Sequence, residues 1–164
     1  MVESKLTNIG RVSKKAIIGA IKGTGEKAQA IVEAAADLAK LTIEGAGDFT
    51  VTVEKKIEAI VNGAINGANE VGGDLFMTIK CTVYGIVKAG SDMGTDVGKT
   101  AVAATKGAIN TAAKTGADIN QTTQKAIAGA IEAGDEMGKH TSKAIKDALR
   151  TSVKGAKDVI GPPS

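Results

Sequence analysis

A repeat of 22 residues constrains this chain more than any other feature of its sequence. Four-residue segments of one pattern, Gly-small-Ile-polar in its clearest copies, start at residues 63, 85, 107 and 129, and an earlier copy starts at residue 19. The third residue is β-branched in all seven successive units: Ile21, Ile43, Ile65, Val87, Ile109, Ile131 and Val153. Such regularity predicts that the chain is built from similar structural units.

The period itself favours helices. Twenty-two is twice 11, and 11 residues make three turns of helix at about 3.67 residues per turn. The larger apolar residues of the third unit fall at helical spacing and predict one stripe along a helix: Ile65, Val71, Leu75, Ile79 and Val83. The competing interpretation is a β-solenoid with 22 residues per coil, but residues 26–40 consist largely of strong helix formers. We therefore expect an all-α fold of elongated helices built from seven 22-residue repeats.

Three segments are expected along the chain: a basic N-terminal segment at residues 1–15, a single helical repeat array at 16–160 and a tail at 161–164. Breaks are predicted near residues 45–48 and 72–74, where glycines precede an aspartate that can cap a helix. The sequence leaves open whether the helices fold back into a hairpin bundle or form a right-handed assembly of longer helices.

The 21 glycines need a physical reason. A glycine inside a helix costs about 0.5 to 1 kcal/mol relative to alanine. Small residues at four-residue spacing leave a groove that another helix can approach closely, which predicts tight packing within one chain or between chains. The alternative is that the glycines keep the free chain disordered until a surface or partner makes it helical. The expected packing residues are the β-branched column above and the glycines Gly19, Gly23, Gly63, Gly67, Gly85, Gly107 and Gly129.

Residues suited to catalysis are sparse. His140, the only histidine, lies on a basic segment and is expected to be a solvated helix residue. Cys81, the only cysteine, has no second thiol or histidine near it in sequence, and acids such as Asp135 and Glu136 are too sparse to predict a metal site. The glycines at residues 63–73 lack the Lys-Ser/Thr ending of a phosphate-binding loop. We expect a protein that is not an enzyme and that has no cofactor, metal or small-molecule substrate.

Positive charge is concentrated towards the two ends and the middle of the chain is acidic, although the net charge is only +3. Near the C-terminus, bases recur every three or four residues and predict a basic amphipathic helix: Lys139, Lys143, Lys146, Arg150, Lys154 and Lys157. Such a helix can bind an anionic membrane, lipid or granule surface; alternatively, its bases are solvated or pair with acids of another copy. With 2% aromatic residues, sequence-specific nucleic-acid binding is not expected. No apolar run spans a bilayer and the start lacks a signal-peptide pattern, which predicts a cytoplasmic protein.

The repeat units from Ala16 to Ile160 resemble the eleven-residue amphipathic repeats of late-embryogenesis-abundant desiccation proteins, lipid-droplet and apolipoprotein coats and, more loosely, bacterial phasins. The resemblance implies a coating, scaffolding or protective role and no site residues. We therefore expect a structural protein that forms homo-oligomers or coats a hydrophobic or anionic surface through its Gly/Ala-faced helices. The alternative is a stress protectant that stays largely disordered until it is dried or bound to lipid.

Overall fold

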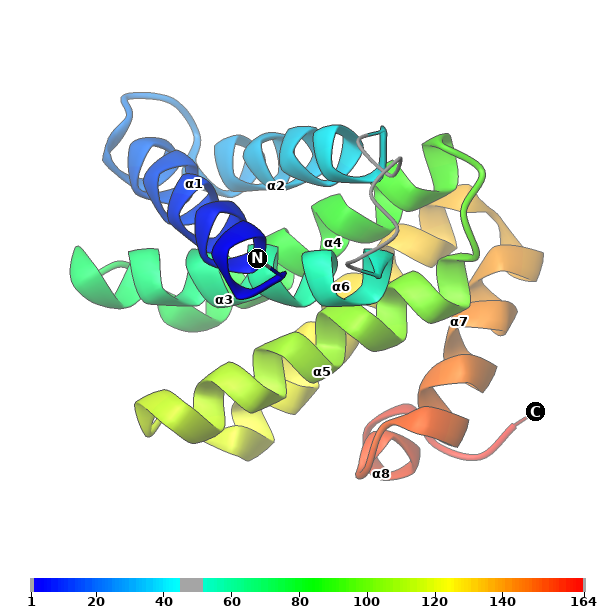
Figure 1. Ribbon diagram of the computed structural model, residues 1–164. Coiled ribbons are helices and arrows are strands. Elements are labelled where there is room, and N and C mark those ends of the chain that lie inside the picture. The colour runs from blue at the N-terminus through cyan, green and yellow to red at the C-terminus, as the bar shows by residue number, and fades with distance from the viewer. Residues whose placement is uncertain (1, 45–51, 164) are drawn as a thin grey trace.

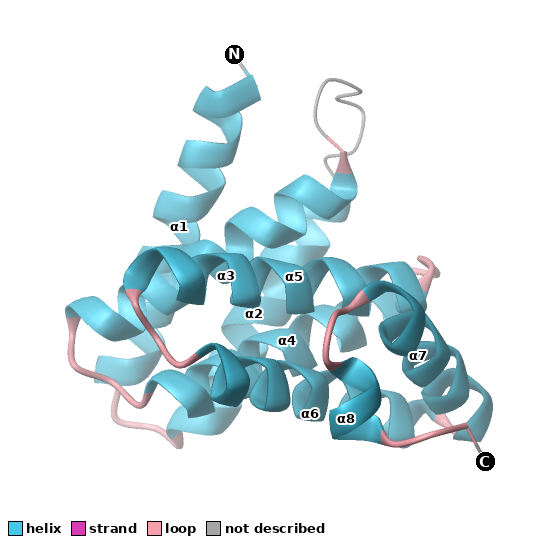
Figure 2. Ribbon diagram, turned by 90° about the horizontal axis from the view of Figure 1, so that it is seen from below, coloured by secondary structure: helices cyan, strands magenta, loops and turns pink. Residues whose placement is uncertain are grey.

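The computed structural model describes residues 2–44 and 52–163, with only the backbone described for residues 2–4. These ranges contain eight helices and no strand, so the all-α prediction is confirmed and the β-solenoid is excluded for them (Figures 1 and 2). The helices are α1 (Val2–Lys22), α2 (Lys27–Glu44), α3 (Val53–Glu70), α4 (Leu75–Asp92), α5 (Val97–Thr115), α6 (Ile119–Met137), α7 (Lys139–Ser152) and α8 (Ala156–Ile160).

One repeat consists of one helix and one turn. Helices α3 to α6 start at residues 53, 75, 97 and 119, which are 22 residues apart. The glycines that end or follow these helices have a positive φ, which glycine adopts without steric cost: Gly72, Gly94, Gly116 and Gly138. The turn after α3 lies at residues 71–74, and the break expected at 45–48 lies outside the described residues. The apolar stripe expected to follow one helix from Ile65 to Val83 is instead divided between α3, this turn and α4.

Aspartates fix the starts of three of these helices. The side chain of Asp74 accepts a hydrogen bond from the Met77 backbone N–H at 3.0 Å. Asp118 accepts one from the Gln121 N–H at 2.9 Å, and Asp96 caps α5 in the same way. These bonds satisfy backbone donors that a helix cannot satisfy internally. Together with the glycine turns, they end each helix after about five turns and reverse the chain.

The helices form a two-layer bundle. Helices α1, α3 and α5 make one layer, α2, α4 and α6 make the other, and α7 and α8 close one end (Figures 1 and 2). Among helices α1 to α6, the most extensive contacts join helices two places apart in the chain: α1 with α3, α2 with α4, α3 with α5 and α4 with α6. Helix α3 therefore lies between α1 and α5. The chain folds back on itself, which is the hairpin-bundle alternative of the two that the sequence left open.

The core is filled by β-branched side chains and alanine. The largest fully buried side chains include Ile57, Ile65, Ile86 and Ile127. In the β-branched repeat column, Ile65 and Val87 are fully buried and Ile21 and Val153 nearly so. Its other members are half-buried: Ile43, Ile109 and Ile131. Within the described ranges, none of the helices combines the length and hydropathy needed to cross a membrane.

Candidate functional site

A second repeat column, which we name the crossing column, marks where stacked helices meet. Its members lie 22 residues apart: Gly19, Leu41, Gly63, Gly85, Gly107, Gly129 and Thr151. A Cβ atom placed on Gly63 would lie only 2.2 Å from the carbonyl oxygen of Gly10 in α1. On Gly129 it would lie 2.3 Å from the carbonyl oxygen of Lys80 in α4. These distances leave no room for a side chain, so the helices touch backbone to backbone.

The other two central glycines lie at equivalent crossings. A Cβ on Gly85 would lie 2.4 Å from the carbonyl oxygen of Val32, and one on Gly107 would lie 3.0 Å from the Cα atom of Glu58. Gly67, one helical turn beyond Gly63, also faces α1 at close range. Glycine at these positions lets the bundle close tightly, and this offsets its unfavourable helix propensity.

The first two members of the crossing column have a different environment. Gly19 is exposed, and no atom beyond its own neighbourhood lies within 4 Å of a Cβ placed on it. Gly23, also predicted to pack, is exposed, and its Cβ would approach only carbonyl groups of its own helix. Leu41 on α2 is 68% exposed, more than any other large apolar residue that the structure describes. On α3 to α6, another helix packs against this position of the repeat. The outer sides of α1 and α2 carry the same position, but no helix packs against it there.

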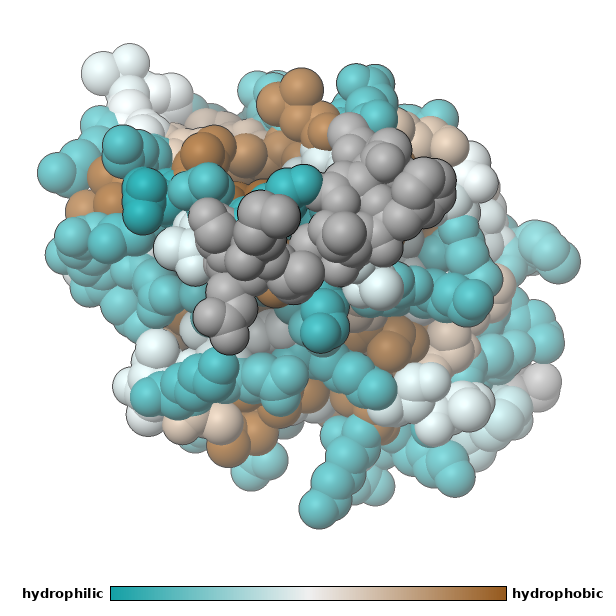
Figure 3. All heavy atoms as spheres, in the orientation of Figure 1, coloured by the Kyte–Doolittle hydropathy of each residue, from teal (hydrophilic) through white to brown (hydrophobic). Residues whose placement is uncertain are grey.

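We name this region the open face: the outer sides of α1 and α2 with Gly19, Leu41 and the groove beside them. The groove has a volume of about 410 Å³ and is lined by the apolar residues Ile9, Val12, Leu38 and Leu41 among polar ones. Val12 is 55% exposed and lies seven residues before Gly19, on the same side of α1. Hydrophobic atoms gather over α1 and α2 in the space-filling view (Figure 3). Exposed apolar residues gathered in this way make the open face a candidate interaction surface.

Opposite charges border the open face. Lys15 is exposed on α1, one helical turn before Gly19, and Asp37 is exposed on α2, one turn before Leu41. Among the described residues, neither has an ion-pair partner. The two helices of the face thus offer charges of opposite sign.

The predicted basic helix near the C-terminus is divided. Helix α7 ends at Ser152, so Lys154 and Lys157 lie beyond it and do not continue its stripe. The turn between α7 and α8 includes Gly155 at φ 87°, which breaks the helical register. The exposed side chains Lys139, Lys154 and Lys157 remain open to solvent, whereas Lys146 is half-buried.

Two of the bases in this segment have partners within the chain. The Arg150 side chain is only 11% exposed and donates to the carbonyl oxygen of Gly161 at 2.8 Å. It also pairs with Asp147 at 3.2 Å, and Lys143 pairs with the same carboxylate at 3.1 Å. Arg150 therefore anchors the C-terminal segment against α7.

The residues that could carry chemistry stand apart. Cys81 is 8% exposed in α4, and burial raises the pKa of its thiol, with Lys80 opposing that effect. His140 is exposed at the start of α7. In the described part of the chain, no three His, Cys, Asp or Glu side chains are arranged to hold a metal ion.

Comparisons with protein-family models, curated proteins and solved structures found no match. The function proposed below is therefore argued from the open face itself and not from a relative. Sequence reasoning named Gly19 as a packing residue but missed Val12 and Leu41. A signal was present, because Leu41 is the one large side chain in a column otherwise made of glycine and threonine.

Proposed function

We propose that this protein is a non-enzymatic structural protein that self-associates, with a second copy docking on the open face. The observation that supports this proposal most is the contrast between members of the crossing column. Its four central members receive a helix in close contact, whereas Gly19 and Leu41 present the corresponding surface to solvent. Burying Val12 and Leu41 in a partner would gain about 1 to 2 kcal/mol for each side chain, because they are 55% and 68% exposed and full burial of an exposed side chain gains about 1.5 to 3 kcal/mol.

A two-fold arrangement suits this face. Leu41 projects from it, and the groove formed with Ile9 and Val12 lies beside it, so knob and groove occur on the same surface. A surface that carries both can pair with itself across a two-fold axis. In such a pair, Lys15 of one copy can approach Asp37 of the other. Opposite charges then face each other and favour this pairing over random aggregation.

The coating of an anionic surface has less support. Arg150 and Lys143, two of the six bases expected to bind it, are already paired within the chain. The stress-protectant alternative requires a free chain without a packed core. Chemical denaturation distinguishes this alternative from the packed bundle, because a disordered chain shows no cooperative unfolding transition.

The test is the molar mass in solution, measured by size-exclusion chromatography with light scattering over a range of concentrations. We expect the wild type to exceed the 16.5 kDa of one chain. The double variant Val12→Lys, Leu41→Lys should return to that mass, because it places charge in a face that must lose water. The matched control is Ile119→Lys, Val159→Lys, which changes two residues that are 46% and 39% exposed away from the open face.

The control should keep the wild-type mass. A wild-type protein with the mass of one chain at every concentration would refute the proposal. So would a control that lowers the mass as much as the open-face variant does, since association would then depend on general hydrophobicity rather than on this face.

A further inference from the structure

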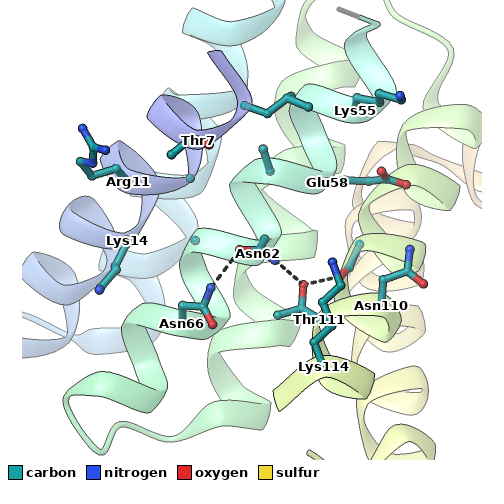
Figure 4. Close-up of a pocket in the computed structure, with 15 residues that line it drawn as sticks. Thr7, Arg11, Lys14, Lys55, Glu58, Asn62, Asn66, Asn110, Thr111 and Lys114 are labelled. Carbon is teal, nitrogen blue, oxygen red and sulfur yellow. Dashed lines mark hydrogen bonds between the residues drawn. The ribbon is translucent and has the colours of Figure 1, made fainter. Parts of the chain in front are cut away.

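A second surface of the molecule is hollowed by the stacking of three helices. Helix α3 forms the floor of a groove whose sides are α1 and α5 (Figure 4). Its volume is about 710 Å³, within the range of pockets that hold small molecules. We name it the amide groove after Asn62 and Asn66 on its floor and Asn110 on its α5 side.

A chain of hydrogen bonds fixes the floor. The amide nitrogen of Asn66 donates to the side-chain oxygen of Asn62 at 2.9 Å, and the amide nitrogen of Asn62 donates to Oγ1 of Thr111 at 3.2 Å. Thr111 in turn donates to the carbonyl oxygen of Gly107 (Figure 4). Each of the two amides keeps one N–H that has no partner among the described residues. Donors held in place in this way can bind a ligand with little loss of side-chain freedom.

Among the described residues, no ion pair joins α3 and α5, the floor and one side of the amide groove. Three stacked helix pairs are joined by a surface ion pair: Lys14–Glu70, Lys40–Asp92 and Lys80–Glu132. In α3 and α5, the positions equivalent to Lys80 and Glu132, 22 residues earlier, hold Glu58 and Asn110. That pairing is thereby lost, and both residues line the groove. Neither Glu58 nor Asn110 has a side-chain partner among the described residues, so both are open to a ligand.

Cations surround the groove. Arg11, Lys55 and Lys114 line it, are exposed, and have no ion-pair partner in the described part of the chain. Lys14 also lines it but pairs with Glu70 at 2.9 Å. Among the described residues, Glu58 is the one carboxylate in the lining. The balance of charge therefore favours an anion, with Glu58 able to accept a hydrogen bond from a hydroxyl group.

We propose that the amide groove binds a small molecule with a phosphate-type oxyanion on a hydroxyl-bearing body. Lysine and arginine form charge-assisted hydrogen bonds with such an oxyanion, and these are stronger than neutral ones. Amides and Glu58 suit hydroxyl groups, which both donate and accept. The phosphate ester can be a free metabolite or the headgroup of a lipid, because both present the same chemistry to the groove. This site lies on α1, α3 and α5 and does not depend on association through the open face.

The test is NMR titration of the isotopically labelled protein with glucose 6-phosphate, inorganic phosphate and glucose. Glucose 6-phosphate should shift the side-chain amide signals of Asn62 and Asn66 in a saturable manner. Inorganic phosphate should bind more weakly, and glucose should cause no shift. Sedimentation with phosphatidylcholine vesicles, with and without phosphatidylinositol phosphate, distinguishes a free metabolite from a lipid headgroup as the ligand. Binding only to the soluble ester assigns a metabolite, whereas binding to the phosphoinositide vesicles as well assigns a headgroup.

The double variant Lys55→Gln, Lys114→Gln should weaken the affinity for glucose 6-phosphate about tenfold or more, as expected for the loss of a charge-assisted hydrogen bond. The control Lys88→Gln, Lys125→Gln removes the same charge from exposed lysines of α4 and α6 outside the groove. It should leave the affinity within about twofold of the wild type. The proposal is overturned if none of the phosphate probes, soluble or in vesicles, binds, if they bind without shifting the Asn62 and Asn66 signals, or if the control weakens binding as much.

Discussion

At the scale of single residues, the neighbour decides what a glycine does. Gly19 and Gly63 occupy the same repeat position, yet only Gly63 lies against another backbone. The sequence alone identifies the column because the repeat is visible in it. The sequence does not show which members of the column are buried, because a member is buried only where the helix two places earlier in the chain packs against it.

Tyr84 offers a clean probe of a single residue, because the chain has one tyrosine and no tryptophan. Burial and then the carboxylate of Glu136 raise the pKa of Tyr84 to about 12, from an ordinary value of 10.0. The neutral phenol is thus favoured in the folded state. Its contribution to stability is complete below about pH 10 and is lost as the pH rises through about 12.

We expect the tyrosinate absorbance of the folded protein to appear at higher pH than that of the protein unfolded in urea. Glu136→Gln should move the folded-state pKa of Tyr84 downwards, because it removes a negative charge that disfavours the phenolate. If folded and unfolded proteins titrate together, the environment described for Tyr84 is wrong.

At the scale of the element, the period has a different cause from the one that its arithmetic suggested. Helix α3 has 18 residues, and a four-residue turn completes the repeat of 22. A period of two elevens also fits a continuous helix, so periodicity could not distinguish the two. The glycines and the capping aspartate of Gly72-Gly73-Asp74 predicted the break between α3 and α4 correctly. The equivalent turns before Asp96 and Asp118 carry the same glycine and aspartate and could have been read in the same way.

These caps make a direct prediction. Replacing Asp74, Asp96 or Asp118 by alanine should lower the free energy of unfolding by about 1 kcal/mol each, because each loses a hydrogen bond to the start of a helix. Urea denaturation measures the change. The control Gln124→Ala alters an exposed polar residue inside α6, away from the open face, and should be neutral or slightly stabilising, since alanine is the better helix former. Equal losses at capping and control positions would show that the turns do not depend on these aspartates.

At the scale of the molecule, the fold class followed from the repeat, but the arrangement of the helices did not. The β-branched column predicts buried positions, and Ile65 and Val87 are buried. Nothing in the spacing required each helix to stack on the one two places earlier, because that depends on contacts between residues about 50 apart, such as Gly63 with Gly10. The open face and the amide groove follow from this stacking, so neither could be predicted before it.

The central claim is that helices stack through glycine crossings in α3 to α6 and that α1 leaves its crossing open. The most direct test compares the urea unfolding of Gly63→Ala and Gly19→Ala with that of the wild type, at one protein concentration low enough for all three to have the mass of one chain. Gly63→Ala should lower the free energy of unfolding by about 1 to 3 kcal/mol, because its Cβ would lie 2.2 Å from the carbonyl oxygen of Gly10. Gly19→Ala should raise it by about 0.5 to 1 kcal/mol, because alanine favours the helix and meets no atom. Changes of the same sign in both variants, or a wild type with no cooperative transition, would contradict the account.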